Sequence, residues 1–138
     1  MFSELMLLAV LGHFVADFVL QPKKMALQKS AQGAKGFFVC MTHVLVYTLV
    51  VCGFWGIWSP LVMILVAAPH WVLDRWSLGN AWLKMIRGRT FEEAFNSSDK
   101  YREFDIAFTS IVYVVVDATL HILSLFAVIK LVLVPHGA

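Results

Sequence analysis

Charged side chains are scarce in this sequence. Only 14% of its 138 residues are Asp, Glu, Lys or Arg, whereas 60% are hydrophobic and the mean hydropathy is +0.78. Soluble domains are typically about a quarter charged and about half apolar, so the composition excludes an ordinary soluble domain and indicates a membrane protein. The net charge is only +2, and the basic residues lie between the apolar segments rather than in one stripe, which excludes a nucleic-acid partner.

The sequence also has no features that indicate a disulfide bond or a cleavable signal peptide. The two cysteines, Cys40 and Cys52, lie twelve residues apart in one hydrophobic segment. They cannot readily pair and form no CxxC ligand motif, so we interpret them as buried free thiols. The amino-terminal segment carries Glu4 where a signal peptide has Lys or Arg, and no small-x-small cleavage site follows. We therefore expect an uncleaved first helix.

Four apolar segments are close to or above the length of about 20 residues that crosses a bilayer. Pro22 follows the first segment, Ser59 and Pro60 suit the N-cap and first position of the third, and Gly79 is predicted to stop it. The predicted fold is all-α and integral to the membrane. It is a single domain over residues 1–138, a four-transmembrane-helix bundle with helices at about 2–20, 37–55, 60–78 and 107–134, joined by connectors at about 21–36 and 79–106.

The second connector is the only sizeable polar region. Thr90-Phe91-Glu92-Glu93 matches a capping box, which predicts a short helix between transmembrane helices three and four. Aromatic residues recur at roughly helical spacing, as expected of a cytoplasmic or interfacial segment lying on the membrane surface; the alternative is a soluble loop. The aromatic residues are Phe91, Phe95, Tyr101, Phe104 and Phe108.

The distribution of basic residues predicts the topology. Ten of the eleven Lys and Arg residues lie in the two long connectors or at Arg75, and only Lys130 lies at the other side. The positive-inside rule then places both connectors in the cytoplasm and both termini outside. We expect a multi-pass protein of the bacterial inner membrane.

Polar residues inside the apolar segments follow a regular pattern. His13 and Asp17, His70 and Asp74, and Asp117 and His121 are each four residues apart. This spacing puts both members of a pair on one face of a helix, roughly 6 Å apart along its axis. His43 lies alone in another apolar segment, and His136, near the end of the chain, is expected to be inert. Ionisable groups are costly inside a bilayer, so they indicate a functional site.

The predicted topology gives all three pairs the same direction in space. Helix four runs opposite to helices one and three and carries its pair in reverse order, so each Asp lies on the cytoplasmic side of its His. Imidazole and carboxylate are the usual ligands of zinc, manganese and iron. We therefore predict one or two divalent transition-metal ions in the inner leaflet. The candidate ligands are His13, Asp17, His43, His70, Asp74, Asp117 and His121. The alternative is a structural network in which each pair hydrogen-bonds within its own helix.

The order of these residues resembles a known family. Gly12-His13 and then Asp17-Phe18-Val19-Leu20-Gln21 is similar to the opening of the bacterial and phage membrane family catalogued as domain of unknown function 3307. Members tend to continue with a downstream Lys, an isolated His, a second His-x-x-x-Asp and a final Asp-Gln-x-x-His. Ala118 stands where the family often has Gln, and Ser77 where a Lys is common. The family is functionally uncharacterised, so the resemblance implies no activity.

The first functional hypothesis is a metal-dependent hydrolase acting on a lipid or lipid-linked phosphoester. Asp17 or Asp74 would act as general base, Lys24 and Arg75 would attract the phosphate, and Gln21 would orient a ligand or headgroup.

Other functions stay open. A transporter of metal ions or protons would also need ionisable residues in its helices, but the apolar outer halves of the helices require a homo-oligomer to complete its path. Haem ligation by histidine pairs is disfavoured by the neighbouring aspartates. The last alternative is a non-enzymatic interaction protein with a structural metal, which would dock a protein partner through residues 80–105.

Overall fold

The computed structural model describes residues 1–88 and 90–134, and His136 lies outside this range. All regular elements in the described part of the chain are helices. In chain order they are α1 (Phe2–Phe14), η1 (Val15–Val19, a π-helical turn), α2 (Lys23–Gln28), α3 (Gly33–Trp55), α4 (Pro60–Arg75), α5 (Leu78–Arg87), α6 (Phe91–Asn96), α7 (Arg102–Val128) and η2 (Ile129–Leu133, also π-helical).

Three helical stretches are long and apolar enough to cross a membrane. They are Phe2–Val19, Gly33–Trp55 and Arg102–Leu133. The helix α4 has 16 residues, fewer than the roughly 20 that span a bilayer. It is long enough to cross a membrane only if α5 is counted with it, and the two helices are bent by 53° relative to each other. The sequence therefore identified the apolar segments, but α3 begins at residue 33 rather than 37 and α7 at residue 102 rather than 107.

The bend between α4 and α5 overturns the predicted role of Gly79. The helix α4 ends at Arg75. Ser77, with φ of 49°, is the N-cap of α5, which begins at Leu78. Gly79 is the second residue of α5 and is buried against α7, where a Cβ atom would lie 2.9 Å from Asp117 Oδ1. A close approach between helices, rather than a helix stop, is what requires glycine at this position.

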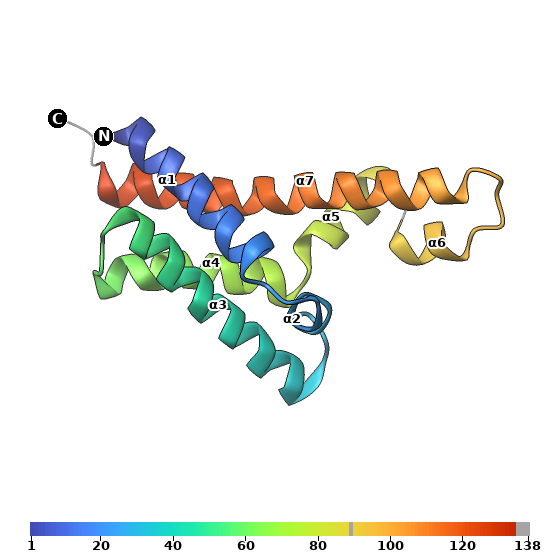
Figure 1. Cartoon of the computed structure of the whole chain (residues 1–138), viewed down its shortest axis with the longest axis horizontal. Coiled ribbons are helices and arrows are strands. Elements are labelled where there is room, and N and C mark those ends of the chain that lie inside the picture. The colour runs from blue at the N-terminus through green and yellow to red at the C-terminus, as the bar shows by residue number, and fades with distance from the viewer. Residues whose placement is uncertain (89, 135–138) are drawn as a thin grey trace.

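The connector before α7 is more helical than predicted. Its capping box is confirmed: Thr90 N–H donates to Glu93 Oε2 at 2.7 Å, and Glu93 N–H donates to Thr90 Oγ1 at 3.2 Å. The additional helix α5 buries Leu83 against the protein and exposes Trp82. In Figure 1, α5 and α6 lie along the amino-terminal part of α7.

The apolar core fills one half of the bundle. The helices α1, α3, α4 and α7 and the π-helical turn η2 contribute Ala9, Tyr47, Val51, Trp55, Val62, Val66, Leu125, Val128 and Ile129. The indole N–H of Trp55 donates to Leu5 O at 3.0 Å and ties α3 to α1, while Phe2 packs edge-on against Phe126 of α7 with ring centroids 5.7 Å apart. On each helix the histidine and aspartate residues begin within about one turn of this core, toward the connectors. The core thus closes the polar cluster on one side.

Candidate metal centre

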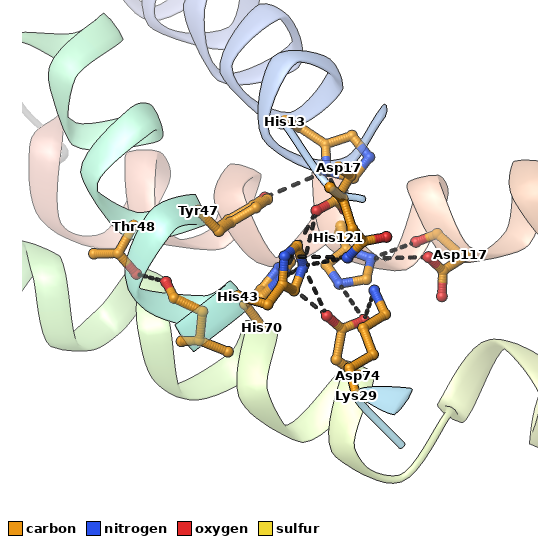
Figure 2. Close-up of polar contacts among 12 residues, drawn as sticks. His13, Asp17, Lys29, His43, Tyr47, Thr48, His70, Asp74, Asp117 and His121 are labelled. Atoms are coloured by element: carbon orange, nitrogen blue, oxygen red, sulfur yellow. Dashed lines mark hydrogen bonds and ion pairs between the residues drawn. The ribbon is translucent and has the colours of Figure 1, made fainter. Parts of the chain in front are cut away.

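The polar cluster is built by four helices whose buried faces meet. Figure 2 shows side chains from α1, η1, α3, α4 and α7 pointing toward one another, with α2 approaching from the connector side. The members predicted from the sequence are His13, Asp17, His43, His70, Asp74, Asp117 and His121. The structure therefore brings all seven predicted ligands into one region.

A π-helical turn places Asp17. In η1 the backbone N–H of Leu20 donates to Val15 O at 2.9 Å, an i to i+5 bond rather than the i to i+4 bond of an α-helix. The wider turn begins two residues after His13 and alters the direction of the side chains within it. Such turns are rare and frequently occur at functional sites.

Four side chains place one ligand atom each in a compact group. His43 Nε2 lies 3.1 Å from Asp17 Oδ1 and 3.1 Å from Asp74 Oδ2. His70 Nε2 lies 3.0 Å from His43 Nε2, 3.1 Å from Asp74 Oδ2 and 3.9 Å from Asp17 Oδ1. In a tetrahedral site with metal–ligand bonds of about 2.0–2.1 Å, neighbouring ligand atoms are about 3.3 Å apart. Four of these five separations are therefore close to the edge of a tetrahedral metal site, and the separation between His70 and Asp17 is longer.

Two overlapping groups of three residues have ligand atoms within 4.8 Å of one another. They are Asp17, His43 and His70, and His70, Asp74 and His121. His70 belongs to both groups. Buried imidazole nitrogens and carboxylate oxygens at these distances can hold a metal ion.

The other predicted ligands contact this group from outside. His13 Nδ1 lies 3.2 Å from Asp17 Oδ2, and His121 Nε2 lies 3.6 Å from Asp74 Oδ1. Asp17 and Asp74 therefore each direct one oxygen toward His43 and the other toward an outer histidine. Asp117 Oδ2 is 3.7 Å from His121 Nδ1. Outer contacts of this kind orient the inner ligands of metal sites.

The centre is buried and contains polar atoms without hydrogen bonds. The four clustered histidines are at most 1% exposed. Both oxygens of Asp17, Oδ2 of Asp74 and one ring nitrogen each of His13, His70 and His121 are buried and form no hydrogen bond. Asp17 Oδ1 and Asp74 Oδ2 nevertheless lie 3.1 Å from His43 Nε2, so these contacts are close but lack hydrogen-bond geometry. Unbonded buried polar atoms are costly, and a cation shared by Asp17 Oδ1 and Asp74 Oδ2 would satisfy these two oxygens.

Lys29 joins the centre and was not among the predicted site residues. Its Nζ lies 2.7 Å from Asp74 Oδ1, and its side chain is 9% exposed. It reaches this position because α2 folds back toward the bundle after Pro22 and ends at Gln28, one residue before Lys29. Four lysines lie between residues 23 and 36, and the sequence contains no signal that distinguishes the buried one.

The three predicted substrate-binding residues occupy different places. The Gln21 amide nitrogen lies 3.1 Å from His43 Nδ1 and 3.0 Å from His43 Nε2, so Gln21 reaches the centre. Arg75 Nη1 donates to the carbonyl oxygens of Ser30 and Ala31 at 3.1 and 3.0 Å, and it thereby holds the turn that carries Lys29. Lys24 is exposed on α2 and lines a separate apolar groove. The structure does not bring Lys24 and Arg75 into the cluster.

Tyr47 is a further residue that the sequence interpretation missed. Its ring stacks on the imidazole of His70 with centroids 3.6 Å apart, and its hydroxyl lies 3.4 Å from His13 Nδ1. The spacing of four residues after His43 on the same helix face could have indicated this position. Tyr47 separates the centre from the apolar core and fixes the plane of the His70 ring.

A cavity of about 450 Å³ opens beside the centre. Its polar lining residues include Asp17, Gln21, Lys29, Asp74, Asn80 and Asp117, and its apolar lining residues include Phe18, Leu27, Phe91 and Val114. Phe18, Leu27 and Val114 also face the exterior of the protein. A ligand could therefore reach the cluster from the side of the bundle where α1, α2 and α7 approach one another.

These features define a class: an all-helical protein with membrane-type helices and a buried His/Asp cluster that can hold a metal ion. The chain belongs to the family described as "Protein of unknown function (DUF3307)", whose family model matches residues 5–137. The resemblance noted in the sequence is thus confirmed over nearly the whole chain. No curated protein and no solved structure matches it.

Proposed function

We propose that this protein is a membrane-embedded, metal-dependent hydrolase whose substrate is a lipid or lipid-linked phosphoester. The observation that carries the proposal is the junction of a compact His/Asp group with a cavity that is lined by both polar and apolar side chains. Enclosed pockets with a few convergent polar groups are typical of active sites.

The proposed membrane arrangement is a four-helix bundle in the bacterial inner membrane. The crossing segments are α1 with η1, α3, α4 with the start of α5, and α7 with η2. The positive-inside rule supports cytoplasmic connectors and outer termini. This orientation puts the cavity in the inner leaflet, where α5 would lie near the membrane surface with Trp82 in the lipid interface and Lys84 toward the headgroups.

We assign the metal ligands to the four residues of the compact group, Asp17, His43, His70 and Asp74, and the outer positions to His13 and His121. A divalent zinc, manganese or iron ion held there would activate water and polarise a phosphoryl oxygen. We assign the general base to Asp117 in place of Asp17 or Asp74. Asp117 lines the cavity but lies outside both three-residue groups, so its carboxylate is available to accept a proton.

The cavity walls support a lipid phosphoester as the substrate. Lys29 contributes a positive charge to the lining of the cavity, and the amides of Gln21 and Asn80 offer hydrogen-bond donors to phosphate oxygens. Phe18 and Val114 form an apolar side where an acyl or polyisoprenyl chain would lie. Transport is less well supported, because the apolar core lies beyond Tyr47 and His70 on the other side of the centre.

Asp117→Asn is expected to keep the bound metal and lower phosphoester turnover by about 10²–10⁴-fold, the usual contribution of a general base. Turnover would be measured as phosphate release from lipid phosphomonoesters and polyisoprenyl-linked pyrophosphates, in detergent, with zinc, manganese or iron added separately. Asp99→Asn is the matched control, since Asp99 is exposed and does not line the cavity.

The same assay tests the function itself. Hydrolysis by wild type that requires added metal supports the proposal. Folded, metal-loaded wild type that releases no phosphate from any of these lipids would refute it, and equal turnover in Asp117→Asn would refute the assignment of the base.

A further inference from the structure

We propose that the centre is built for one divalent ion, because the ammonium group of Lys29 takes the place of a second cation. This inference rests on the proposed metal site but not on the proposed hydrolysis. Three observations carry it: the shared position of His70, the balance of buried charge, and the contacts of Lys29.

The two possible ligand groups exclude one another. Both of them include His70, and the atom that faces Asp74 Oδ2 at 3.1 Å and Asp17 Oδ1 at 3.9 Å is the same nitrogen, Nε2. A neutral imidazole nitrogen has one lone pair and binds one ion. The two groups therefore cannot both hold an ion through His70, and a second ion would have to bind Asp74 Oδ1 and His121 Nε2 without it.

The buried charges balance with a single ion. Asp17, Asp74 and Asp117 carry three negative charges, Lys29 carries one positive charge and a divalent ion carries two, so they cancel. A second divalent ion would leave two uncompensated positive charges among buried side chains, which is strongly unfavourable inside a membrane protein. Without the charge of Lys29 it would leave only one, whereas a single ion would then leave one uncompensated negative charge. The four clustered histidines stay neutral in this arrangement, as metal-binding imidazoles are.

Lys29 lies where a second ion would otherwise bind. The Nδ1–H of His121 donates to Asp117 O at 2.8 Å, so in the neutral ring of this arrangement Nε2 carries the lone pair. That nitrogen lies 3.6 Å from Asp74 Oδ1. A nitrogen lone pair and a carboxylate oxygen repel each other unless a cation lies between or beside the two atoms. Lys29 Nζ supplies this positive charge, since it lies 2.7 Å from Asp74 Oδ1 (Figure 2). Without the ammonium group, Asp74 Oδ1 and His121 Nε2 are left as a pair of free ligands.

The test counts ions in full-length variants. Wild type, Lys29→Met and Lys29→Arg would be purified in detergent, stripped with a chelator, loaded with excess Zn²⁺ and examined by native mass spectrometry. We expect about one zinc ion in wild type and in Lys29→Arg, which keeps the charge, and about two in Lys29→Met, which removes it. Lys29→Gln is a second neutral variant, with an amide that can still donate to Asp74 Oδ1, in case Lys29→Met does not fold.

Each outcome decides the inference. Two ions in wild type, or none, would overturn it, as would a single ion in the folded neutral variants. Ion counts do not depend on turnover, so the two proposals can fail separately. One ion in wild type without phosphate release would refute only the hydrolase, whereas two ions with phosphate release would refute only the role of Lys29.

Discussion

His70→Ala is expected to abolish metal binding. His70 belongs to both groups of ligand atoms, and its Nε2 lies within 3.9 Å of His43, Asp74 and Asp17. Removal of an outer partner typically weakens metal affinity by about 10–100-fold, and loss of this inner ligand should exceed that range. The measurement is competition for Zn²⁺ against a chelator of known affinity, with wild type and variant in the same detergent.

Two control variants separate loss of a ligand from loss of structure. Thr48→Val changes a buried polar residue of α3 whose hydroxyl donates only to Val44 O at 2.8 Å, so it should leave metal affinity unchanged. His13→Ala removes an outer contact to Asp17 and should fall within the range of about 10–100-fold. A folded His70→Ala variant that binds zinc as tightly as wild type would contradict the assignment.

Asp74→Asn is expected to cause the largest loss of stability in the metal-free protein. Asp74 is 3% exposed and is the charge partner of Lys29, which is 7% exposed. Neutralising one member of a buried ion pair leaves the other charge uncompensated and costs about 3–5 kcal/mol. The measurement is the free energy of unfolding in detergent, with a chelator present so that metal binding does not contribute.

The double variant Asp74→Asn/Lys29→Met tests the cause of that loss. It removes both charges, so it should recover a large part of the stability lost in Asp74→Asn, as a double-mutant cycle would show. Strictly additive losses would mean that Lys29 and Asp74 do not interact in the folded protein. Lys24→Met, at an exposed lysine of α2, should leave stability within about 0.5 kcal/mol of wild type.

The candidate ligands could be predicted because their signal is periodic. A His and an Asp four residues apart share a helix face in any α-helix, and a bilayer makes their presence informative. The same reasoning could not separate inner from outer ligands. Whether His13 or His43 lies at the middle of the cluster depends on the π-helical turn η1 and on how the helices rotate against one another, and neither has a clear sequence signature.

Lys29 and α5 show where the sequence interpretation failed. Lys29 is one of four similar lysines in a polar connector, and only the fold of α2 and the hydrogen bonds from Arg75 to the following turn single it out. The helix α5 was missed because Gly79 was interpreted as a helix stop. Glycine also permits close packing of helices. Gly79 lies close to Asp117 because α5 packs against α7, and the local sequence does not encode this packing.

The most direct test of the central claim is the metal content of the folded wild-type protein. Protein purified without chelator would be passed through gel filtration and measured by inductively coupled plasma mass spectrometry, before and after incubation with zinc, manganese or iron. The account predicts about one transition-metal ion per chain, held by the buried His and Asp ligands. Folded protein that carries no metal, and takes up none after incubation with any of the three, would contradict it.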